Sequence, residues 1–297
     1  MNYQEELIDL PDGRVLEVAA QGDTAGTTVF LHHGTPGSTR TLDAFAPLLD
    51  VGDFFIVTLS RPGYGRSSRL AGRNIAAVVE DARHVLDFFE RDRYVALGWS
   101  GGGPHALACA ALDAPRCTGA VTLASVVPID VDFDWTEGMA PENVEEFALA
   151  KEGGPEFEEA METTGTIMGD MTTENAVDIF AGLLSDPDRN VLSEDQALKA
   201  FVDATRHAFS ESWRGYYDDN AAFYMNWGFD PRSIAVPVEI FYGDQDLMVP
   251  PNHGAWLASH LPTARSHHDE SEGHLSIWAR HFDEVAKALT SVSRENS

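Results

Sequence analysis

A serine set between glycines, in Gly98-Trp99-Ser100-Gly101-Gly102, is the segment of this sequence best suited to carry out chemistry. The pattern G-x-S-x-G forms a sharp turn that holds the serine in a strained backbone conformation with its hydroxyl exposed. Glycines at its two ends let the flanking strand and helix pass closely, because a Cβ atom there would clash. We therefore predict Ser100 as a nucleophile. The backbone N–H of Gly101, at the start of the helix, would point towards an oxyanion.

The residues on either side of this motif favour the strand and the helix that its mechanism requires. Residues 94–97 are an apolar run typical of a buried strand, and residues 105–112 are rich in alanine and favour a helix. A glycine-rich turn with an incidental serine is the alternative interpretation. The strand–turn–helix context favours the catalytic one.

A serine nucleophile needs a base, and the base needs an acid to orient it. Of the eleven histidines, His274 stands out because it lies in a glycine-containing loop just after a predicted strand. Asp244 and Asp246 follow an earlier predicted strand, although an aspartate in such a loop is more often a turn-former. The order Ser100, Asp246, His274 is one of the chain orders in which a serine–acid–histidine set occurs.

Length and composition indicate the broad class of protein. A chain of 297 residues with 43% hydrophobic composition can bury one large core, as one α/β domain with an insertion or as two domains. No run of about 18 apolar residues predicts a membrane span. The acidic N-terminus lacks an apolar secretory core, which predicts a cytoplasmic location. Cys109 and Cys117 are expected to be buried free thiols rather than a disulfide or a metal site.

The formal net charge of −28 excludes nucleic acid as a partner. Only three of the 20 basic residues are lysine. An acid-rich, lysine-poor surface suits solvation in concentrated salt, so a salt-loving source is one hypothesis. An ordinary arginine-rich composition is the alternative.

Apolar runs that predict strands alternate with helical patterns over most of the chain. After an opening hairpin over residues 7–19, the strands are predicted at 27–31, 54–59, 94–97, 120–124, 236–242 and 264–268. Strands separated by helices indicate a mostly parallel sheet, with ligand sites at the carboxyl ends of its strands.

Residues 128–235 interrupt this alternation. They show no clear strand run, but helix-like patches at 141–150, 156–168, 174–184 and 194–209. Their many aromatic side chains argue against a disordered acidic segment. We therefore predict a core domain made of residues 1–127 and 236–297, with residues 128–235 inserted as a helical lid.

Five segments together resemble the α/β-hydrolase superfamily over nearly the full length of the chain. His33-Gly34-Thr35-Pro36-Gly37 is similar to the H-G-x-P-G loop of that family, and residues 98–102 to its nucleophile elbow. Residues 61–67, 243–250 and 273–274 resemble its second glycine-containing loop, its acid loop and its histidine loop. The resemblance implies a mostly parallel eight-stranded sheet with helices on both faces and an inserted helical lid.

The same resemblance implies the roles of individual residues. Ser100 would be the nucleophile, His274 the base and Asp246 the orienting acid. The backbone N–H groups of Thr35 and Gly101 would form the oxyanion hole. Asp130 is an alternative acid, because some relatives place the acid after the preceding strand.

Serine at the elbow, rather than the carboxylate of members that open epoxides, favours attack on a carbonyl. Hydrolysis of a carboxylic ester or lactone is the expected reaction. An aminopeptidase resembling proline iminopeptidase, a carbon–carbon bond hydrolase with Arg206 or Arg214 binding an acidic substrate, and a non-catalytic binding protein are the alternatives. No metal or organic cofactor is expected, and the chain is expected to be a monomer or homodimer.

The lid is expected to select the substrate. Its aromatic side chains are too numerous to leave in water, so Trp213, Tyr217 and Trp227 are predicted to face the pocket, with Trp99 and Gly34 on the opposite side. The expected substrate is then a neutral, medium-sized apolar acyl compound. The alternative is that these rings are structural and that other residues line the pocket.

Overall fold

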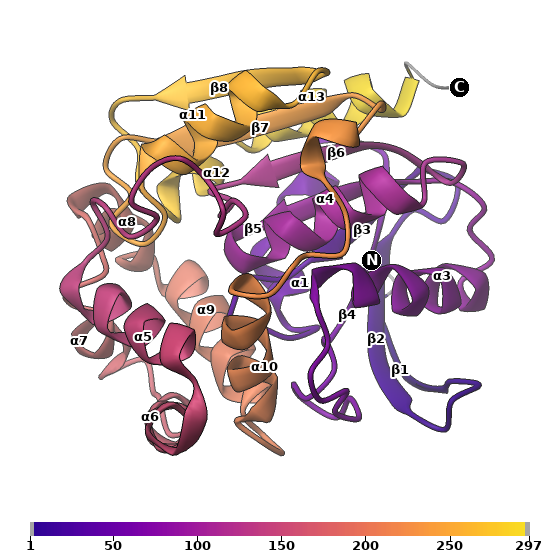
Figure 1. Ribbon diagram of the computed structural model, residues 1–297. Coiled ribbons are helices and arrows are strands. Elements are labelled where there is room, and N and C mark those ends of the chain that lie inside the picture. Colours follow the sequence, from indigo (N-terminus) through magenta and orange to yellow (C-terminus); the bar gives the residue numbers. More distant parts are fainter. Residues whose placement is uncertain (1–2, 295–297) are drawn as a thin grey trace.

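A single eight-stranded sheet organises the molecule (Figure 1). The computed structural model describes residues 3–294, and the strands lie in the order β1-β2-β4-β3-β5-β6-β7-β8. The strands are β1 (Tyr3–Asp9), β2 (Val15–Gly22), β3 (Thr27–His32), β4 (Phe54–Leu59), β5 (Tyr94–Trp99), β6 (Cys117–Leu123), β7 (Val238–Gly243) and β8 (Ala264–Asp269).

β2 pairs antiparallel with both of its neighbours, the edge strand β1 and the strand β4. The pairs from β4 to β8 are all parallel. This confirms the predicted mostly parallel eight-stranded sheet. Because parallel strands end at the same edge, the loops that follow β3, β5, β7 and β8 gather there.

Alternate side chains of each strand enter two different apolar cores, one on each face of the sheet. In β5, Ala96 packs into one core, whereas Val95 and Leu97 pack into the other. The first face is covered by α3 (Val78–Phe88), α4 (Gly103–Leu112) and α11 (Pro251–His260). The second is covered by α1 (Thr41–Ala44), α2 (Leu48–Val51), α12 (Ser276–Ala279) and α13 (Phe282–Arg294).

Residues 128–235, between β6 and β7, are helical and contain no strand, and the structure describes all of them. We use the name lid for this segment. Figure 1 shows its helices gathered on one side of the sheet. They are α5 (Pro141–Glu152), α6 (Gly154–Gly169), α7 (Ala176–Ile179), α8 (Asp186–Leu192), α9 (Asp195–Ala208) and α10 (Arg214–Phe223). The patch predicted over 174–184 shortens to α7, and α8 and α10 were not predicted. Short 3-10 helices are η1 (Ile75–Ala77), η2 (Ser100–Gly102) and η3 (Pro231–Ser233).

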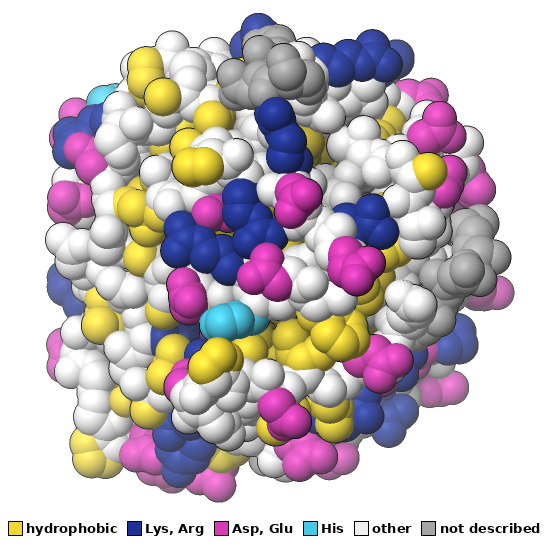
Figure 2. Space-filling view, turned by 90° about the vertical axis from the view of Figure 1, so that its right-hand side faces the viewer, with side chains coloured by type: hydrophobic (Ala, Val, Ile, Leu, Met, Phe, Trp, Pro, Cys, Tyr) yellow, Lys and Arg dark blue, Asp and Glu magenta, His cyan; other side chains and the backbone are white. Residues whose placement is uncertain are grey.

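Three features expected from the composition can be compared with the structure: membrane-spanning helices, the state of the cysteines and the surface charge. None of the helices in residues 3–294 combines the length and the apolar character needed to cross a membrane. Cys109 and Cys117 are buried and free, as predicted. On the face drawn in Figure 2, basic side chains lie among acidic ones rather than in one large basic patch.

Candidate active site

Ser100 adopts the strained conformation that the elbow motif predicts. It follows β5 directly and has a φ of 55°, in the left-handed region that non-glycine residues rarely occupy. A Cβ atom on Gly98 would lie 2.4 Å from the carbonyl oxygen of Gly102, and one on Gly102 would lie 2.1 Å from that of His32. Both glycines are therefore required by close backbone approach. The turn projects Ser100 beyond the carboxyl edge of the sheet.

The loop after β3 lies against this turn. A Cβ atom on Gly101 would be 2.3 Å from the hydroxyl of Thr35, and one on Gly34 would be 3.5 Å from Cβ of Ser100. The structure thus brings Gly34, Thr35, Ser100 and Gly101 together. Because these segments meet beside the serine, we propose that the backbone N–H groups of Thr35 and Gly101 serve one oxyanion.

His274 and Asp246 form a buried pair. Nδ1 of His274 lies 2.8 Å from Oδ2 of Asp246, and both side chains are almost fully buried. The other oxygen of Asp246 accepts hydrogen bonds from the backbone N–H groups of Met248 and Val249, each at 2.8 Å. These bonds hold the carboxylate in place, so it can keep the imidazole in one orientation.

The two alternative acids lie elsewhere. Asp244 is exposed and pairs with Nε2 of His268 at 2.7 Å. Asp130 lies in an exposed turn after β6 and borders a different cavity. Among Asp130, Asp244 and Asp246, only Asp246 contacts His274.

Burial by itself lowers the pKa of His274, but the carboxylates of Asp246 and Asp188 outweigh that effect and raise the pKa above its ordinary value. The imidazole therefore accepts a proton more readily than an ordinary histidine.

The elbow and the histidine loop are joined by a hydrogen bond, because the indole N–H of Trp99 donates to the carbonyl oxygen of His274 at 3.3 Å.

Asp188 of helix α8 is a residue that the sequence did not reveal, and it holds the histidine loop from the lid side. Its side chain is fully buried. It accepts hydrogen bonds from the backbone N–H groups of His274 at 2.9 Å, Leu275 at 2.7 Å and Ser276 at 3.0 Å. A Cβ atom on Gly273 would lie 2.5 Å from the same carboxylate, which explains the glycine before the histidine.

These contacts make Asp188 a positioning residue, and we expect the Asp188→Asn variant to lower kcat/KM by about tenfold to a hundredfold because the histidine loop shifts. Removal of the negative charge should also lower the pKa of His274, so the acid limb of the pH–rate profile should move to lower pH. Asp186→Asn, on the exposed side of the same helix, is the control. A profile that keeps its wild-type midpoint in Asp188→Asn would contradict this role.

A second buried lid carboxylate, Asp219 of α10, was also not foreseen, and it contacts the loop after β3. It accepts from the hydroxyl of Thr35 at 2.8 Å and from Nη2 of Arg61 at 2.6 Å. Burial tends to raise the pKa of Asp219, but Arg61 and Arg73 hold it well below its usual range. The same Arg61 side chain donates to the carbonyl oxygens of His33 and Gly34. This ion-pair cluster fixes the loop that carries the proposed oxyanion donor.

Ser100 opens into a cavity of about 540 Å³ between the sheet domain and the lid helices. Most of its walls are apolar, and its charged lining residues are carboxylates. The lid contributes Glu142, Glu145, Glu146, Phe147, Met161, Ile167, Ile179, Phe180, Tyr216 and Phe223, among others. The cavity is large enough for a medium-sized acyl compound.

The residues predicted to line this cavity from the lid do not line it, which corrects the prediction. Tyr217 stacks on Phe157 with ring centroids 4.6 Å apart and meets Trp213 edge to face. Trp227 is buried and borders another cavity. Trp213 and Tyr217 pack against each other, and Trp227 packs against Phe229, so these rings leave water without facing the substrate.

Trp99 and Gly34 are likewise not among the residues that line the Ser100 cavity. Trp99 borders a smaller cavity of about 210 Å³ together with Leu275 and Trp278. The prediction that Trp99 lines this pocket on the side opposite the lid is therefore wrong. Gly34 lies next to the serine, and its carbonyl oxygen accepts a hydrogen bond from Arg61.

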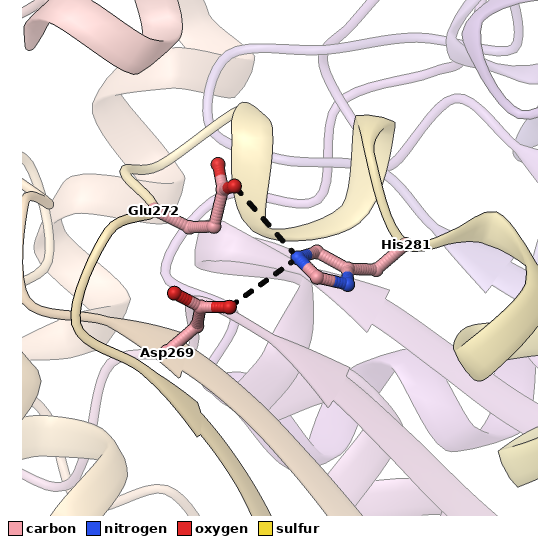
Figure 3. Close-up of side chains that lie close together, drawn as sticks. All are labelled: Asp269, Glu272 and His281. Atoms are coloured by element: carbon pink, nitrogen blue, oxygen red, sulfur yellow. Dashed lines mark ion pairs between the residues drawn. The ribbon is translucent and has the colours of Figure 1, made fainter.

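One side-chain cluster has the composition of a metal site. Figure 3 shows His281 between Asp269 and Glu272, with Nε2 3.6 Å and 3.8 Å from their carboxylate oxygens. The guanidinium of Arg280 lies 3.6 Å from the same oxygen of Glu272. The chain thus supplies its own cation here, and the distances are those of an ion-pair network behind the histidine loop.

Comparison with known proteins agrees with this geometry. A family model described as "alpha/beta hydrolase fold" matches residues 27–151. A non-heme haloperoxidase from Rhodococcus erythropolis is 27% identical over 231 residues, which cover 76% of this chain and 77% of that protein. An uncharacterized hydrolase of Bacillus subtilis, YcgS, is 31% identical, but the match covers only 39% of each chain.

Among solved structures, the esterase RhEst1 from a Rhodococcus species is similar in fold. It superposes with a TM-score of 0.70 at 20% identity, and the match covers 98% of this chain and 100% of that one. At this identity the likeness concerns the fold alone.

Proposed function

We propose that this chain, which belongs to the α/β-hydrolase superfamily, is a serine hydrolase that cleaves a carboxylic ester or lactone through an acyl-enzyme on Ser100. The observation that carries the proposal is the buried contact between His274 and Asp246. The histidine loop is bonded to Trp99, the residue before Ser100, and Ser100 has the left-handed conformation and lines a mostly apolar cavity. Such a set is suited to acyl transfer.

In the proposed mechanism, Oγ of Ser100 attacks the substrate carbonyl while Nε2 of His274 takes its proton. The negative charge that develops on the carbonyl oxygen is stabilised by the N–H groups of Thr35 and Gly101, at about 3–4 kcal/mol for each donor. His274 then returns the proton to the leaving alcohol. Water, activated by the same imidazole, releases the acid from Ser100.

Asp246 would keep the proton of the neutral imidazole on Nδ1, leaving Nε2 free to act as the base. It would also stabilise the imidazolium that forms during each step. The raised pKa of His274 fits this role, since a stronger base takes the serine proton more readily.

The charges in the cavity bear on the alternative reactions. Among residues 3–294, no lysine, arginine or histidine lines the Ser100 cavity. Arg214 instead pairs with Glu158 at 3.2 Å, and Arg206 borders a separate surface hollow. The cavity therefore does not favour the acidic substrate of a carbon–carbon bond hydrolase.

An aminopeptidase remains the second candidate, and Glu146 in the cavity wall is the observation that favours it, since a carboxylate can bind a free amino group. Both candidates share the proposed nucleophile and base. They differ in whether the scissile bond is an ester or an amide.

A panel of p-nitrophenyl esters, lactones and aminoacyl anilides, measured at low and high salt, tests the proposed function. We expect ester or lactone hydrolysis to exceed anilide hydrolysis, because an alcohol leaves a tetrahedral intermediate more readily than an amine. Turnover of anilides with no turnover of esters would replace the proposal by its alternative. No turnover in any class would contradict both.

A further inference from the structure

We propose that Glu146 is a specificity-determining residue that selects acyl substrates carrying an ammonium group and disfavours those carrying a carboxylate. This inference rests on the proposed function, because it concerns the same cavity and requires Ser100 to act on a carbonyl. It goes beyond that function by naming the charge of the substrate.

The contacts of Glu146 leave one of its oxygens available. Oε1 accepts a hydrogen bond from the hydroxyl of Tyr216 at 2.5 Å and another from the amide of Asn220 at 3.1 Å. Tyr216 and Asn220 both come from α10, so the two donors hold the carboxyl group from a single helix. Among residues 3–294, no other hydrogen bond or ion pair involves Glu146. Oε2 is therefore without a donor, and the side chain lines the cavity that contains Ser100.

This carboxyl group also lacks a counter-charge. Within residues 3–294 it has no ion pair with a lysine, arginine or histidine, in contrast to the buried Asp219, which pairs with Arg61. Glu146 is half-buried in the cavity wall, and a cation placed against such a carboxylate stabilises it. A substrate ammonium group in the cavity would supply that cation and would donate to Oε2. A substrate carboxylate would instead meet like charge.

The neighbouring carboxylates do not share this position. Glu142 and Glu145 also line the cavity but are exposed, so water and salt screen their charges. Glu146 lies deeper on the same helix, next to the buried Phe147. It is therefore the carboxyl group whose charge a substrate would experience most strongly.

Protonation of Glu146 makes the selection depend on pH. Burial raises the pKa of its carboxyl group to about 7, against the opposing effect of the hydrogen bonds from Tyr216 and Asn220. The other titratable groups that line the cavity are Glu142 and Glu145 of α5, and Tyr216 of α10, whose own pKa is raised well above its ordinary value. Glu146 is thus neutral below about pH 7 and anionic above it, so preference for a cation should grow as the pH rises.

Three p-nitrophenyl esters of equal chain length test the inference. They are the heptanoate, the 6-aminohexanoate and the heptanedioate monoester, whose acyl chains end in a methyl, an ammonium and a carboxylate group. We measure kcat/KM for each between about pH 6 and pH 8. We expect the ammonium ester to be preferred over the methyl ester by roughly tenfold at the upper pH, and the carboxylate ester to be the poorest.

The ratio of the ammonium to the methyl ester isolates Glu146 from the catalytic base. Titration of His274 changes both rates equally and cancels in the ratio. The ratio should therefore rise with a midpoint near pH 7. This measurement needs no variant, so it does not depend on how a substitution folds.

Glu146→Gln keeps an oxygen for Tyr216 and Asn220 but removes the charge, so the ratio should fall to about one and lose its pH dependence. Glu152→Gln, at the exposed end of the same helix, removes one charge outside the cavity and should keep the wild-type ratio. A wild-type ratio near one at every pH, or an unchanged ratio in Glu146→Gln, would overturn the inference while ester turnover kept the proposed function intact. If none of the three esters were hydrolysed, that result would count against the proposed function itself.

Discussion

The Ser100→Ala variant should lose turnover of every acyl substrate, by about 10⁴–10⁶-fold, while its fold stays intact. The hydroxyl of Ser100 is the group that would form the acyl-enzyme, and no other part of the proposed set can replace it. The backbone turn should persist, because the surrounding glycines and the β5–α4 junction set its shape. Circular dichroism and thermal melting would check the fold, and kcat/KM for a p-nitrophenyl ester would measure the loss.

Covalent labelling provides an independent measurement of the same prediction. A serine-directed phosphonate should modify the wild-type protein once, and peptide mass spectrometry should find the label on Ser100. Ser125→Ala changes another serine close to the elbow helix and should keep turnover and labelling. Label on a different residue, or turnover that survives in Ser100→Ala, would refute the assignment of the nucleophile.

The Asp246→Asn variant should lower kcat by about 10⁴-fold. Asparagine can still accept the N–H groups of Met248 and Val249 through its carbonyl oxygen, so the loop should remain in place and the melting temperature should change little. Its amide nitrogen would then face Nδ1 of His274 and could only donate. The imidazole would have to accept at Nδ1 and carry its proton on Nε2, which removes the base.

Asp244→Asn is the matched control for this prediction. Asp244 lies two residues earlier in the same loop, but it is exposed and pairs with His268. The variant should therefore keep nearly all activity. Loss of activity in Asp244→Asn together with normal activity in Asp246→Asn would reverse the assignment of the acid.

The core of the candidate site could be predicted because each part carries a local signal. The turn around Ser100 requires glycines at fixed positions, and the clashes that a Cβ atom would make at Gly98 and Gly102 account for that requirement. Asp246 follows an apolar strand that is visible in the sequence, whereas His274 follows the polar strand β8 and is marked mainly by the glycine before it. Parallel strands bring such loops to one edge, so local patterns and sheet geometry were together sufficient to predict this grouping.

The contribution of the lid could not be predicted in the same way. Asp188, Asp219 and Glu146 are three of many acidic residues in residues 128–235, and nothing in their immediate neighbours separates them from the exposed ones. Asp188 contacts the histidine loop, Asp219 contacts the loop after β3, and Glu146 lines the cavity. Their partners are far away in sequence, so only the packing of the helices against the core decides which carboxylates are buried.

The same reason explains the errors in the lid. Helix α10 contains glycine, aspartates and aromatic residues that favour a helix only weakly, and its ion pairs with Arg61 and Arg69 depend on tertiary contacts. Of the lid aromatic side chains predicted to face the pocket, Trp227 is buried, whereas Trp213 and Tyr217 are half-buried. Burial of a ring does not determine the surface against which it packs. By itself the sequence determined the sheet, the elbow and the chain order of Ser100, Asp246 and His274, because these follow from periodicity and backbone sterics. Only the tertiary structure decided which side chains line the cavity and which lid carboxylates hold the site, because these depend on contacts between segments that no local pattern couples.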